Sequence, residues 1–343
     1  MSNRVVEDPR IDPRIKSVFA AGGTYELPNL PSREALLALE QREETIALVA
    51  AMKASQETIN YETLVPSTGL TVRTQQIASA PDGNSINLQI ITPSRQGPWP
   101  CVYYIHGGGM MMSSCYDPNF RAWGRLIAHQ HVVVVMVDFR NALRPSSVSE
   151  VAPFPAGLND CVSGLRWVHA NSAALNIDPT RVIVAGESGG ANLALATALK
   201  LKREGNLSLI KGLYVMCPYL AGEWSNESGR SALENRGILM DVHSTFGPMA
   251  YGIEELHRRN PLAWPGFASE EDVAGFPPVI IVVNECDPLR DDGVEFYRLL
   301  LRSGVSARCR QQMGTVHGTE IYVICCPDIS RDAARDIAAF CAE

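Results

Sequence analysis

The sequence of 343 residues lacks any long apolar run and carries little positive charge. No stretch approaches the roughly 18 apolar residues that a membrane-spanning helix needs. The polar start, MSNRVVEDPRIDPRIK, has no apolar h-region, so we expect no secretory signal. The formal net charge of -7 does not suit the basic surface of a nucleic-acid-binding protein. We therefore expect a neutral small molecule as partner, without nucleic acid and without a membrane span.

The nine cysteines form no C-x-x-C pair, and their odd number does not suit a closed disulfide framework. Metal and redox sites are therefore not expected, and no cofactor is predicted. Free thiols suit a reducing compartment, so the sequence predicts a cytoplasmic location. We expect the vicinal Cys325 and Cys326 to be buried as small apolar side chains. The oligomeric state stays open, and a homodimer is allowed.

Hydrophobic residues make up 46% of the chain, which is enough for a large core. From about residue 71, short runs suited to β-strands recur along the chain. The predicted strands are Thr71–Ile77, Ile86–Thr92, Cys101–Ile105, Val132–Val137, Arg181–Ala185, Gly212–Met216, Pro278–Val283 and Ala307–Gln311. The sequence Asp-Gly-Asn at residues 82–84 is typical of a hairpin turn, so the first two strands should pair antiparallel.

Helical patterns alternate with the later strands. They cover Asn119–Gln130, Ala156–Ala170, Gly189–Glu204, Asp291–Ser303 and Asp328–Cys341. Several strands, such as VVVVMV and VIVA, are apolar throughout, as strands buried on both faces are. The sequence therefore predicts an α/β fold: a mostly parallel eight-stranded sheet with helices on both faces.

Two segments fall outside this alternation. Residues 1 to about 25 look irregular, and a single long helix is predicted over Ser32–Ala54. Its apolar face would consist of Leu36, Leu37, Leu39, Ile46, Leu48 and Val49. From Tyr219 to about Gly275 we predict an irregular helical insertion. We expect residues 1–70 and 219–275 to form a helical cap over a core of residues 71–218 and 276–343.

The sequence G-E-S-G-G at residues 186–190 fits the pattern G-x-S-x-G. It follows the predicted strand Arg181–Ala185 and opens a predicted helix, and in that context the pattern indicates a nucleophile elbow. The sharp turn would expose the Ser188 hydroxyl at the edge of the sheet, where the helix dipole favours developing negative charge. The alternative is a glycine–serine turn that only caps the helix.

A serine hydroxyl needs a base to take its proton, and in this architecture the order along the chain is serine, acid, histidine. Of the seven histidines, only His243, His257 and His317 follow Ser188. The first two lie in the irregular insertion, whereas His317 lies in a loop after the last predicted strand. We therefore predict His317 as the base. The alternative is a solvated loop histidine.

The acid is expected after the preceding strand, where Glu285, Asp287, Asp291 and Asp292 are candidates. Pro288 holds Asp287 in a loop, whereas Asp291 and Asp292 look like first-turn residues of a helix. We predict Asp287 as the acid, with Glu285 as the alternative. Its task would be to orient the imidazole and to stabilise the imidazolium.

The run YIHGGGMMM ends a predicted strand in three glycines, residues 107–109. Attack on an ester carbonyl places negative charge on its oxygen, and backbone N–H groups aimed at that oxygen stabilise the charge. A glycine loop can come close because it has no Cβ atoms. We predict that Gly107 and Gly108 donate two N–H groups and Gly189 a third. His106 is expected to fix the loop by a hydrogen bond.

The residues after these glycines are candidates for the substrate pocket. Met110, Met111, Met112 and Trp123 could line its acyl or alcohol side, because methionine adapts to irregular apolar shapes. The alternative for these four side chains is ordinary packing under the cap.

These motifs together resemble those of the hormone-sensitive-lipase family of α/β-hydrolases. The resemblance rests on H-G-G-G at residues 106–109, G-E-S-G-G at 186–190, D-P-L-R-D at 287–291 and H-G at 317–318. It implies an α/β-hydrolase fold and a carboxylic ester hydrolase without a cofactor. It also implies a Ser188–Asp287–His317 triad and a cap built from the N-terminal helices and the insertion.

The chain departs from the family pattern beside the nucleophile. Many members have Asp or Thr and then Ala there, where this chain has Glu187 and Gly189. We expect such changes to affect substrate preference and to leave the triad intact. The prediction is a serine carboxylesterase that acts through an acyl-enzyme on short-chain or small-molecule esters, with lactones suggested by the resemblance. The alternatives are a lyase or dehydratase, and a non-catalytic small-molecule receptor, on the same scaffold.

Overall fold

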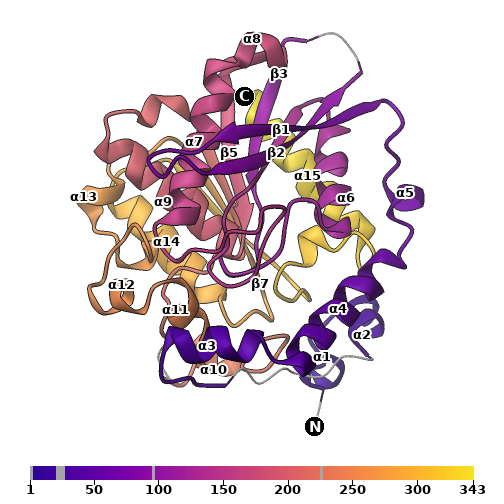
Figure 1. Cartoon of the computed structure of the whole chain (residues 1–343), viewed down its shortest axis with the longest axis vertical. Coiled ribbons are helices and arrows are strands. Elements are labelled where there is room, and N and C mark those ends of the chain that lie inside the picture. The colour runs from indigo at the N-terminus through magenta and orange to yellow at the C-terminus, as the bar shows by residue number, and fades with distance from the viewer. Residues whose placement is uncertain (1–2, 21–27, 95–96, 225–226) are drawn as a thin grey trace.

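The centre of the molecule is an eight-stranded sheet (Figure 1). The structure is a computed structural model, and it describes residues 3–20, 28–94, 97–224 and 227–343. The strands are β1 (Leu70–Ala78), β2 (Ser85–Pro93), β3 (Trp99–Ile105), β4 (Val133–Asp138), β5 (Ile177–Glu187), β6 (Gly212–Met216), β7 (Val279–Asn284) and β8 (Ala307–Gln312). Their order across the sheet is β1-β2-β4-β3-β5-β6-β7-β8. Strand β2 is antiparallel to β1 and β4, and every other pair is parallel. The predicted mostly parallel sheet and its first hairpin are confirmed.

Helices cover both faces of this sheet and the ends of its strands. They are α1 (Arg4–Glu7), α2 (Pro13–Phe19), α3 (Arg33–Glu40), α4 (Glu43–Glu57), α5 (Tyr61–Leu64), α6 (Pro118–Ala128), α7 (Ala156–Ala170), α8 (Ser172–Leu175), α9 (Gly189–Arg203), α10 (Ser231–Glu234), α11 (Phe246–Tyr251), α12 (Ile253–His257), α13 (Glu270–Val273), α14 (Arg290–Arg302) and α15 (Pro327–Ala342), with short 3-10 helices at Leu207–Leu209, Pro265–Phe267 and Thr319–Ile321. The five helices predicted after the third strand agree with α6, α7, α9, α14 and α15. In the part of the chain that the structure describes, no helix is both long enough and apolar enough to cross a membrane.

The core consists of two apolar layers, one on each face of the sheet. Neighbouring residues of a strand point to opposite layers: Tyr103 belongs to one and Tyr104 to the other, as do Val135 and Met136. Helices α7, α9 and α14 pack on the first layer, and α6 and α15 on the second (Figure 1). Because both faces are covered, the central strands are apolar throughout, as the sequence predicts.

The N-terminal segment is more helical than predicted. The expectation of an irregular segment over residues 1–25 is wrong for α1 and α2. The Asp12 side chain caps α2 by accepting the N–H of Arg14, and Pro13 occupies the first helical position. The Asp-Pro pair was thus a helix-start signal in the sequence. Residues 21–25 lie outside the described residues.

The single helix predicted over Ser32–Ala54 is instead two helices, α3 and α4. The break falls at Arg42, whose backbone is extended (φ -70°, ψ 141°). It allows the two helices to pack differently, because α3 buries Leu36 whereas α4 buries none of its side chains. Ile46 and Leu48, which belong to the predicted apolar face, are about half exposed. The spacing of apolar residues in the sequence does not reveal that the chain changes direction between α3 and α4.

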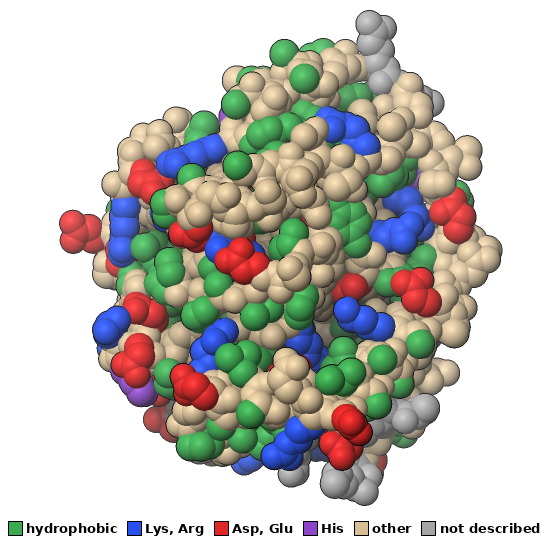
Figure 2. All heavy atoms as spheres, viewed as in Figure 1, with side chains coloured by type: hydrophobic (Ala, Val, Ile, Leu, Met, Phe, Trp, Pro, Cys, Tyr) green, Lys and Arg blue, Asp and Glu red, His purple; other side chains and the backbone are tan. Residues whose placement is uncertain are grey.

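Segments far apart in the sequence meet beyond the ends of the strands. Leu36 of α3 packs with Phe246 and Ala250 of α11 and with Met111 from the loop after β3. Figure 1 shows α3 and α11 close together at the lower edge of the molecule. On the face shown in Figure 2, acidic and basic side chains are interspersed rather than separated into large areas of one sign.

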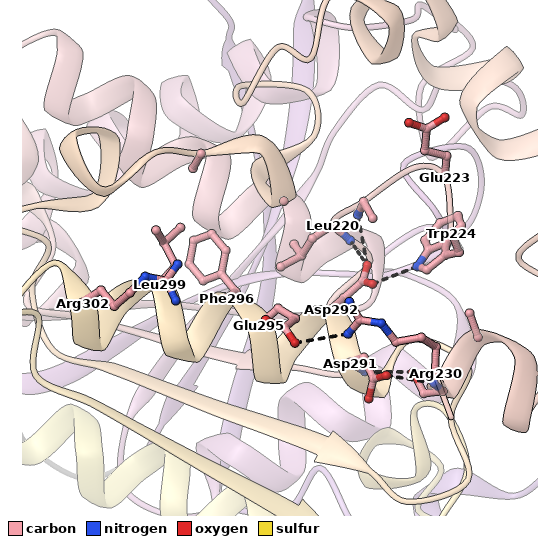
Figure 3. A pocket seen from close by; sticks show the side chains of 15 residues that line it. Leu220, Glu223, Trp224, Arg230, Asp291, Asp292, Glu295, Phe296, Leu299 and Arg302 are labelled. Carbon is pink, nitrogen blue, oxygen red and sulfur yellow. Dashed lines mark hydrogen bonds and ion pairs between the residues drawn. The ribbon is translucent and has the colours of Figure 1, made fainter. Parts of the chain in front are cut away.

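One partly buried carboxylate fastens the segment after β6 to the core (Figure 3). Asp292, in the first turn of α14 as predicted, accepts the N–H groups of Leu220 at 2.9 Å and Ala221 at 3.0 Å. It also accepts the indole N–H of Trp224 at 2.8 Å. Three donors on one short segment therefore depend on a single side chain of the core.

Replacing Asp292 by alanine is expected to lower the free energy of unfolding by about 2 to 4 kcal/mol, because three N–H groups lose their acceptor. Urea unfolding followed by circular dichroism measures this loss. Asp332→Ala, which removes an exposed carboxylate of α15, is the matched control and should change stability by less than about 0.5 kcal/mol. Equal losses in the two variants would contradict the tethering role.

Candidate active site

Ser188 lies at the sharp turn between β5 and α9, as the motif predicts. Its backbone has φ 56° and ψ -121°, a conformation that costs energy for a residue with a side chain. A Cβ on Gly186 would lie 2.6 Å from the carbonyl oxygen of Gly190, so the two glycines of the motif permit the turn. The turn places the Ser188 hydroxyl at the N-terminus of α9, which is the positive end of the helix dipole.

The structure brings Ser188, His317 and Asp287 together. His317 Nε2 lies 2.8 Å from Ser188 Oγ, and His317 Nδ1 lies 2.8 Å from Asp287 Oδ2. Asp287 follows β7 and His317 follows β8, so all three side chains come from the carboxyl ends of strands. The buried Asp287 carboxylate also accepts the N–H of Leu289, which fixes its orientation. In this arrangement a carboxylate orients an imidazole toward a hydroxyl.

Two opposing effects act on the pKa of His317. Burial favours the neutral ring and lowers the pKa, whereas the adjacent Asp287 carboxylate favours the cation and raises it. The carboxylate prevails, so the pKa of His317 lies well above its usual value of 6.5. The ring is therefore a stronger base toward the Ser188 hydroxyl than an isolated buried histidine would be.

Glu285 and His243 have other partners, and His257 lies in the insertion between β6 and β7. Glu285 Oε2 accepts the N–H of Gly314 at 2.7 Å and so fastens the loop that follows β8. His243 lies 3.2 Å from the carboxylate of Asp241, and His257 lies at the end of α12. The geometry therefore favours the acid and the base that the sequence predicts.

The glycine loop after β3 differs from the prediction at its first residue. The N–H of Gly107 donates to Glu187 Oε1, so this N–H is already in use. The structure therefore does not support Gly107 as an oxyanion donor. The N–H groups of Gly108, Gly109 and Gly189 have no acceptor among the described residues. A Cβ on Gly189 would lie 2.8 Å from the Gly109 nitrogen, so these amides gather beside the nucleophile.

His106 fixes the start of this loop, as expected. Its Nδ1 lies 2.8 Å from the carbonyl oxygen of Gly107, and its ring stacks on Phe139 with centroids 4.4 Å apart. Burial lowers the pKa of His106, which keeps the ring neutral. The side chain therefore acts as a structural part of the loop.

A cavity of about 350 Å³ opens onto Ser188 and His317. Met111 and Met112 line it, as predicted from the sequence. Further apolar lining comes from Phe120, Tyr219, Met240, Val242, Phe246 and Ile321. The cavity walls therefore come from the loop after β3, from α6 and from the segment between β6 and β7.

Met110 and Trp123 lie in the core instead of the cavity wall, so their prediction as pocket residues is corrected. The chain turns at Met110 (φ 60°), whose side chain packs in the same layer as Tyr103. Trp123 is fully buried on the inner side of α6, edge-to-face with Tyr104 at a centroid distance of 6.4 Å. Ordinary packing, the alternative from the sequence, applies to these two side chains.

Cys217 lies beside the histidine and the aspartate, and its sulfur, His317 and Asp287 offer ligand atoms within 4.8 Å of one another. Both nitrogens of His317 already have partners, the Asp287 carboxylate and the Ser188 hydroxyl. Burial raises the pKa of the Cys217 thiol to about 11, which keeps it protonated and a poor ligand. A metal ion would have to break a hydrogen bond of the triad, so the cluster suits proton transfer better than metal binding.

Comparison with known proteins agrees with this geometry. A family model described as the alpha/beta hydrolase fold matches residues 102–321. The chain belongs to the α/β-hydrolase family. This α/β-hydrolase is 33% identical over 247 residues to carboxylesterase NlhH of Mycobacterium tuberculosis (strain ATCC 25618 / H37Rv), across 70% of the chain and 72% of that protein.

Solved esterase structures match this α/β-hydrolase over nearly its whole length. Esterase Est22 has 56% identity and a TM-score of 0.96, covering 99% of both chains. Brefeldin A esterase, described as a bacterial homologue of human hormone-sensitive lipase, has 33% identity and a TM-score of 0.83, covering 98% of this chain and 95% of that one. The predicted hormone-sensitive-lipase family and the predicted carboxylesterase activity are confirmed.

Proposed function

We propose that this carboxylesterase acts through an acyl-enzyme on Ser188. The observation that carries the proposal is the hydrogen-bonded chain from Ser188 through His317 to Asp287, with 2.8 Å at each step. A nucleophile, a base and an orienting acid within hydrogen-bond reach are what a two-step acyl transfer needs.

In the first step Ser188 Oγ attacks the ester carbonyl carbon while His317 Nε2 takes the hydroxyl proton. Asp287 stabilises the imidazolium and stays ionised. His317 then gives the proton to the departing alcohol oxygen, and the acyl group stays on Ser188. In the second step water attacks the acyl-enzyme by the same route, and the acid leaves.

We propose Gly108, Gly109 and Gly189 as the donors to the oxyanion. Their free N–H groups beside the nucleophile support this set, which replaces Gly107 of the sequence-based prediction by Gly109. Each such donor is worth about 3 kcal/mol of transition-state stabilisation. The dipole of α9, which begins at Gly189, adds to the same effect.

The cavity supports short-chain or small-molecule esters as substrates. Its volume of about 350 Å³ and its mostly apolar wall, including Met111 and Met112, suit a compact apolar acyl or alcohol group. The similarity to brefeldin A esterase extends the proposal to lactones, in which the alcohol stays joined to the acyl group.

We further propose that residues 1–70 and 219–275 form a cap over the core of residues 71–218 and 276–343. Support comes from the contact between α3 and α11 and from the cap residues Gln56 and Val242 in the cavity wall. A cytoplasmic location is also proposed, because all nine cysteines are free thiols. The exposed apolar side chains of α4 are compatible with a homodimer.

Titration with an organophosphonate tests the acyl-enzyme proposal. The expected result is one phosphonyl group per chain, located on Ser188 by peptide mass mapping. Hydrolysis of a p-nitrophenyl ester, measured in the same samples, should fall in proportion to the label. Hydrolysis that persists in fully labelled protein would contradict the proposal. Absence of ester turnover in unlabelled protein would instead favour the lyase or the receptor.

A further inference from the structure

Glu187, the residue before the nucleophile, has its carboxyl group buried beneath the glycine loop. The residue is 2% exposed. Oε1 accepts the N–H of Gly107, and Oε2 is hydrogen-bonded to the hydroxyl group of Tyr104 on β3. The carboxyl group therefore joins the central strand, the nucleophile turn and the glycine loop.

The first glycine of the loop is shaped by this contact. A Cβ on Gly107 would lie 2.6 Å from Glu187 Oε1, so any other residue at this position would displace the carboxyl group. The two residues that follow have φ values of +100° at Gly108 and +63° at Gly109. Because glycine populates many conformations, a loop of three glycines needs an external contact to hold one of them.

We propose that Glu187 is a positioning residue for oxyanion stabilisation. Its neutral carboxyl group holds Gly107 so that the N–H groups of Gly108 and Gly109 face the carbonyl oxygen of the substrate. Glu187 acts through Gly107 and not on the reacting atoms. The inference rests on the proposed acyl transfer and adds a residue to it that the triad and the oxyanion donors do not include.

The neutral form matters because of where the group lies. A carboxylate directly behind the glycine loop would repel the oxyanion that the loop is meant to stabilise. Burial raises the pKa of Glu187 to about 8, although the hydrogen bonds with Tyr104 and Gly107 lower it. At neutral pH the carboxyl group is therefore protonated, while Oε1 still accepts from Gly107 and Oε2 from the hydroxyl group of Tyr104.

The titratable groups that face Glu187 supply no compensating positive charge in the form of the enzyme that attacks the ester, in which His317 is unprotonated. They are Tyr104 on β3 and, among the described residues after β8, His317 and Tyr322. Burial raises the pKa of both tyrosines, so they stay neutral. His317 must be unprotonated to act as the base, and it gains its proton from Ser188 at the moment at which the oxyanion forms.

Two variants separate positioning from charge. Glu187→Gln keeps the shape and both contacts, because the amide oxygen accepts from Gly107 and the amide nitrogen donates to Tyr104. Its kcat is expected to stay within about 3-fold of the wild-type value. Glu187→Ala releases the loop, and its kcat should fall by about 30- to 100-fold with KM nearly unchanged, because the donors serve the transition state.

The dependence of kcat on pH gives a second readout. Above about pH 8 the wild-type side chain ionises, and the new negative charge should lower kcat. Glu187→Gln does not titrate, so this alkaline decrease should be absent from its profile. A wild-type profile that stays flat up to pH 10, or an alkaline decrease of the same size in the glutamine variant, would overturn the neutral-carboxyl part of the inference.

Two further variants separate a loss of kcat caused by the glycine loop from a loss caused by misfolding. Asp336→Ala also loses a carboxylate that accepts a hydrogen bond from a tyrosine hydroxyl, Tyr214 on β6, but away from the glycine loop, and should keep the wild-type kcat. If Glu187→Ala does not fold, Glu187→Asp, which withdraws the carboxyl group from Gly107 by one methylene, should show the same loss of kcat. Equal kcat values in the wild type and whichever of these variants folds would overturn the inference.

Phosphonate labelling distinguishes this inference from the proposed function. Normal labelling of Ser188 in the wild type, together with an unaltered kcat in Glu187→Ala, rejects the role of Glu187 alone. Failure to label the wild type rejects the acyl-enzyme itself. Normal labelling with the predicted loss of kcat supports both.

Discussion

Replacing Ser188 by alanine is expected to lower kcat for a p-nitrophenyl short-chain ester by about 10⁶-fold, because the chemistry loses its nucleophile. The fold should survive, since Ser188 contributes a hydroxyl but no buried apolar group. The strained φ of 56° remains in the variant, so no gain in stability from relief of strain is expected. Release of p-nitrophenol at high enzyme concentration measures the loss of activity, and thermal unfolding checks the fold.

A serine outside the site provides the matched control. Ser303, at the end of α14, donates its hydroxyl to the carbonyl oxygen of Leu299. Ser303→Ala, purified in the same way as Ser188→Ala, should have the wild-type kcat. Ser188→Ala could retain more than about one hundredth of the wild-type activity without a contaminating esterase in the sample. Such a result would show that another group attacks the ester.

Replacing Asp287 by asparagine is expected to lower kcat by about 10⁴-fold, because the imidazole loses its orientation and the imidazolium its counter-charge. The pH profile should also change in a defined direction. The Asp287 carboxylate raises the pKa of His317, and the base must be unprotonated to act. The variant retains burial, which lowers the pKa, but lacks the carboxylate. The acid limb of kcat/KM should therefore move to lower pH while the maximum falls.

Profiles of kcat/KM between pH 4 and pH 10 measure both effects. Glu285→Gln is the matched control, since its amide oxygen can still accept the N–H of Gly314 and Glu285 does not contact His317. It should keep the position of the acid limb and most of the activity. An acid limb at an unchanged pH in Asp287→Asn would mean that this carboxylate does not set the pKa of the base.

The sequence was sufficient for the parts of the molecule that depend on local patterns and chain order. The G-E-S-G-G sequence at residues 186–190 predicts its own strand–turn–helix context, because Gly186 and Gly190 are required by the close approach of the chain at that turn. The order of serine, acid and histidine reduced seven histidines to three, and the loop after the last strand then favoured His317. The apolar strands likewise predicted a sheet with both faces covered.

Other features depend on contacts between distant residues, which no local pattern contains. The use of the Gly107 N–H is decided by a carboxyl group 80 positions away in the chain. Glu187 was visible in the sequence only as a departure from the family pattern. Met110 differs from Met111 and Met112 because the backbone turns at that residue and directs one of three identical side chains inward. The break between α3 and α4 is decided by what each helix packs against.

Helix α4 has a consequence for how substrates reach the cavity. It buries none of its 15 residues, and a helix of that length is only marginally stable without tertiary contacts. Segments with few buried apolar contacts open locally at a low free-energy cost, well below that of global unfolding. Gln56 of α4 lines the cavity, so such local opening would widen the cavity on this side and leave the sheet, with the triad at its strand ends, in place.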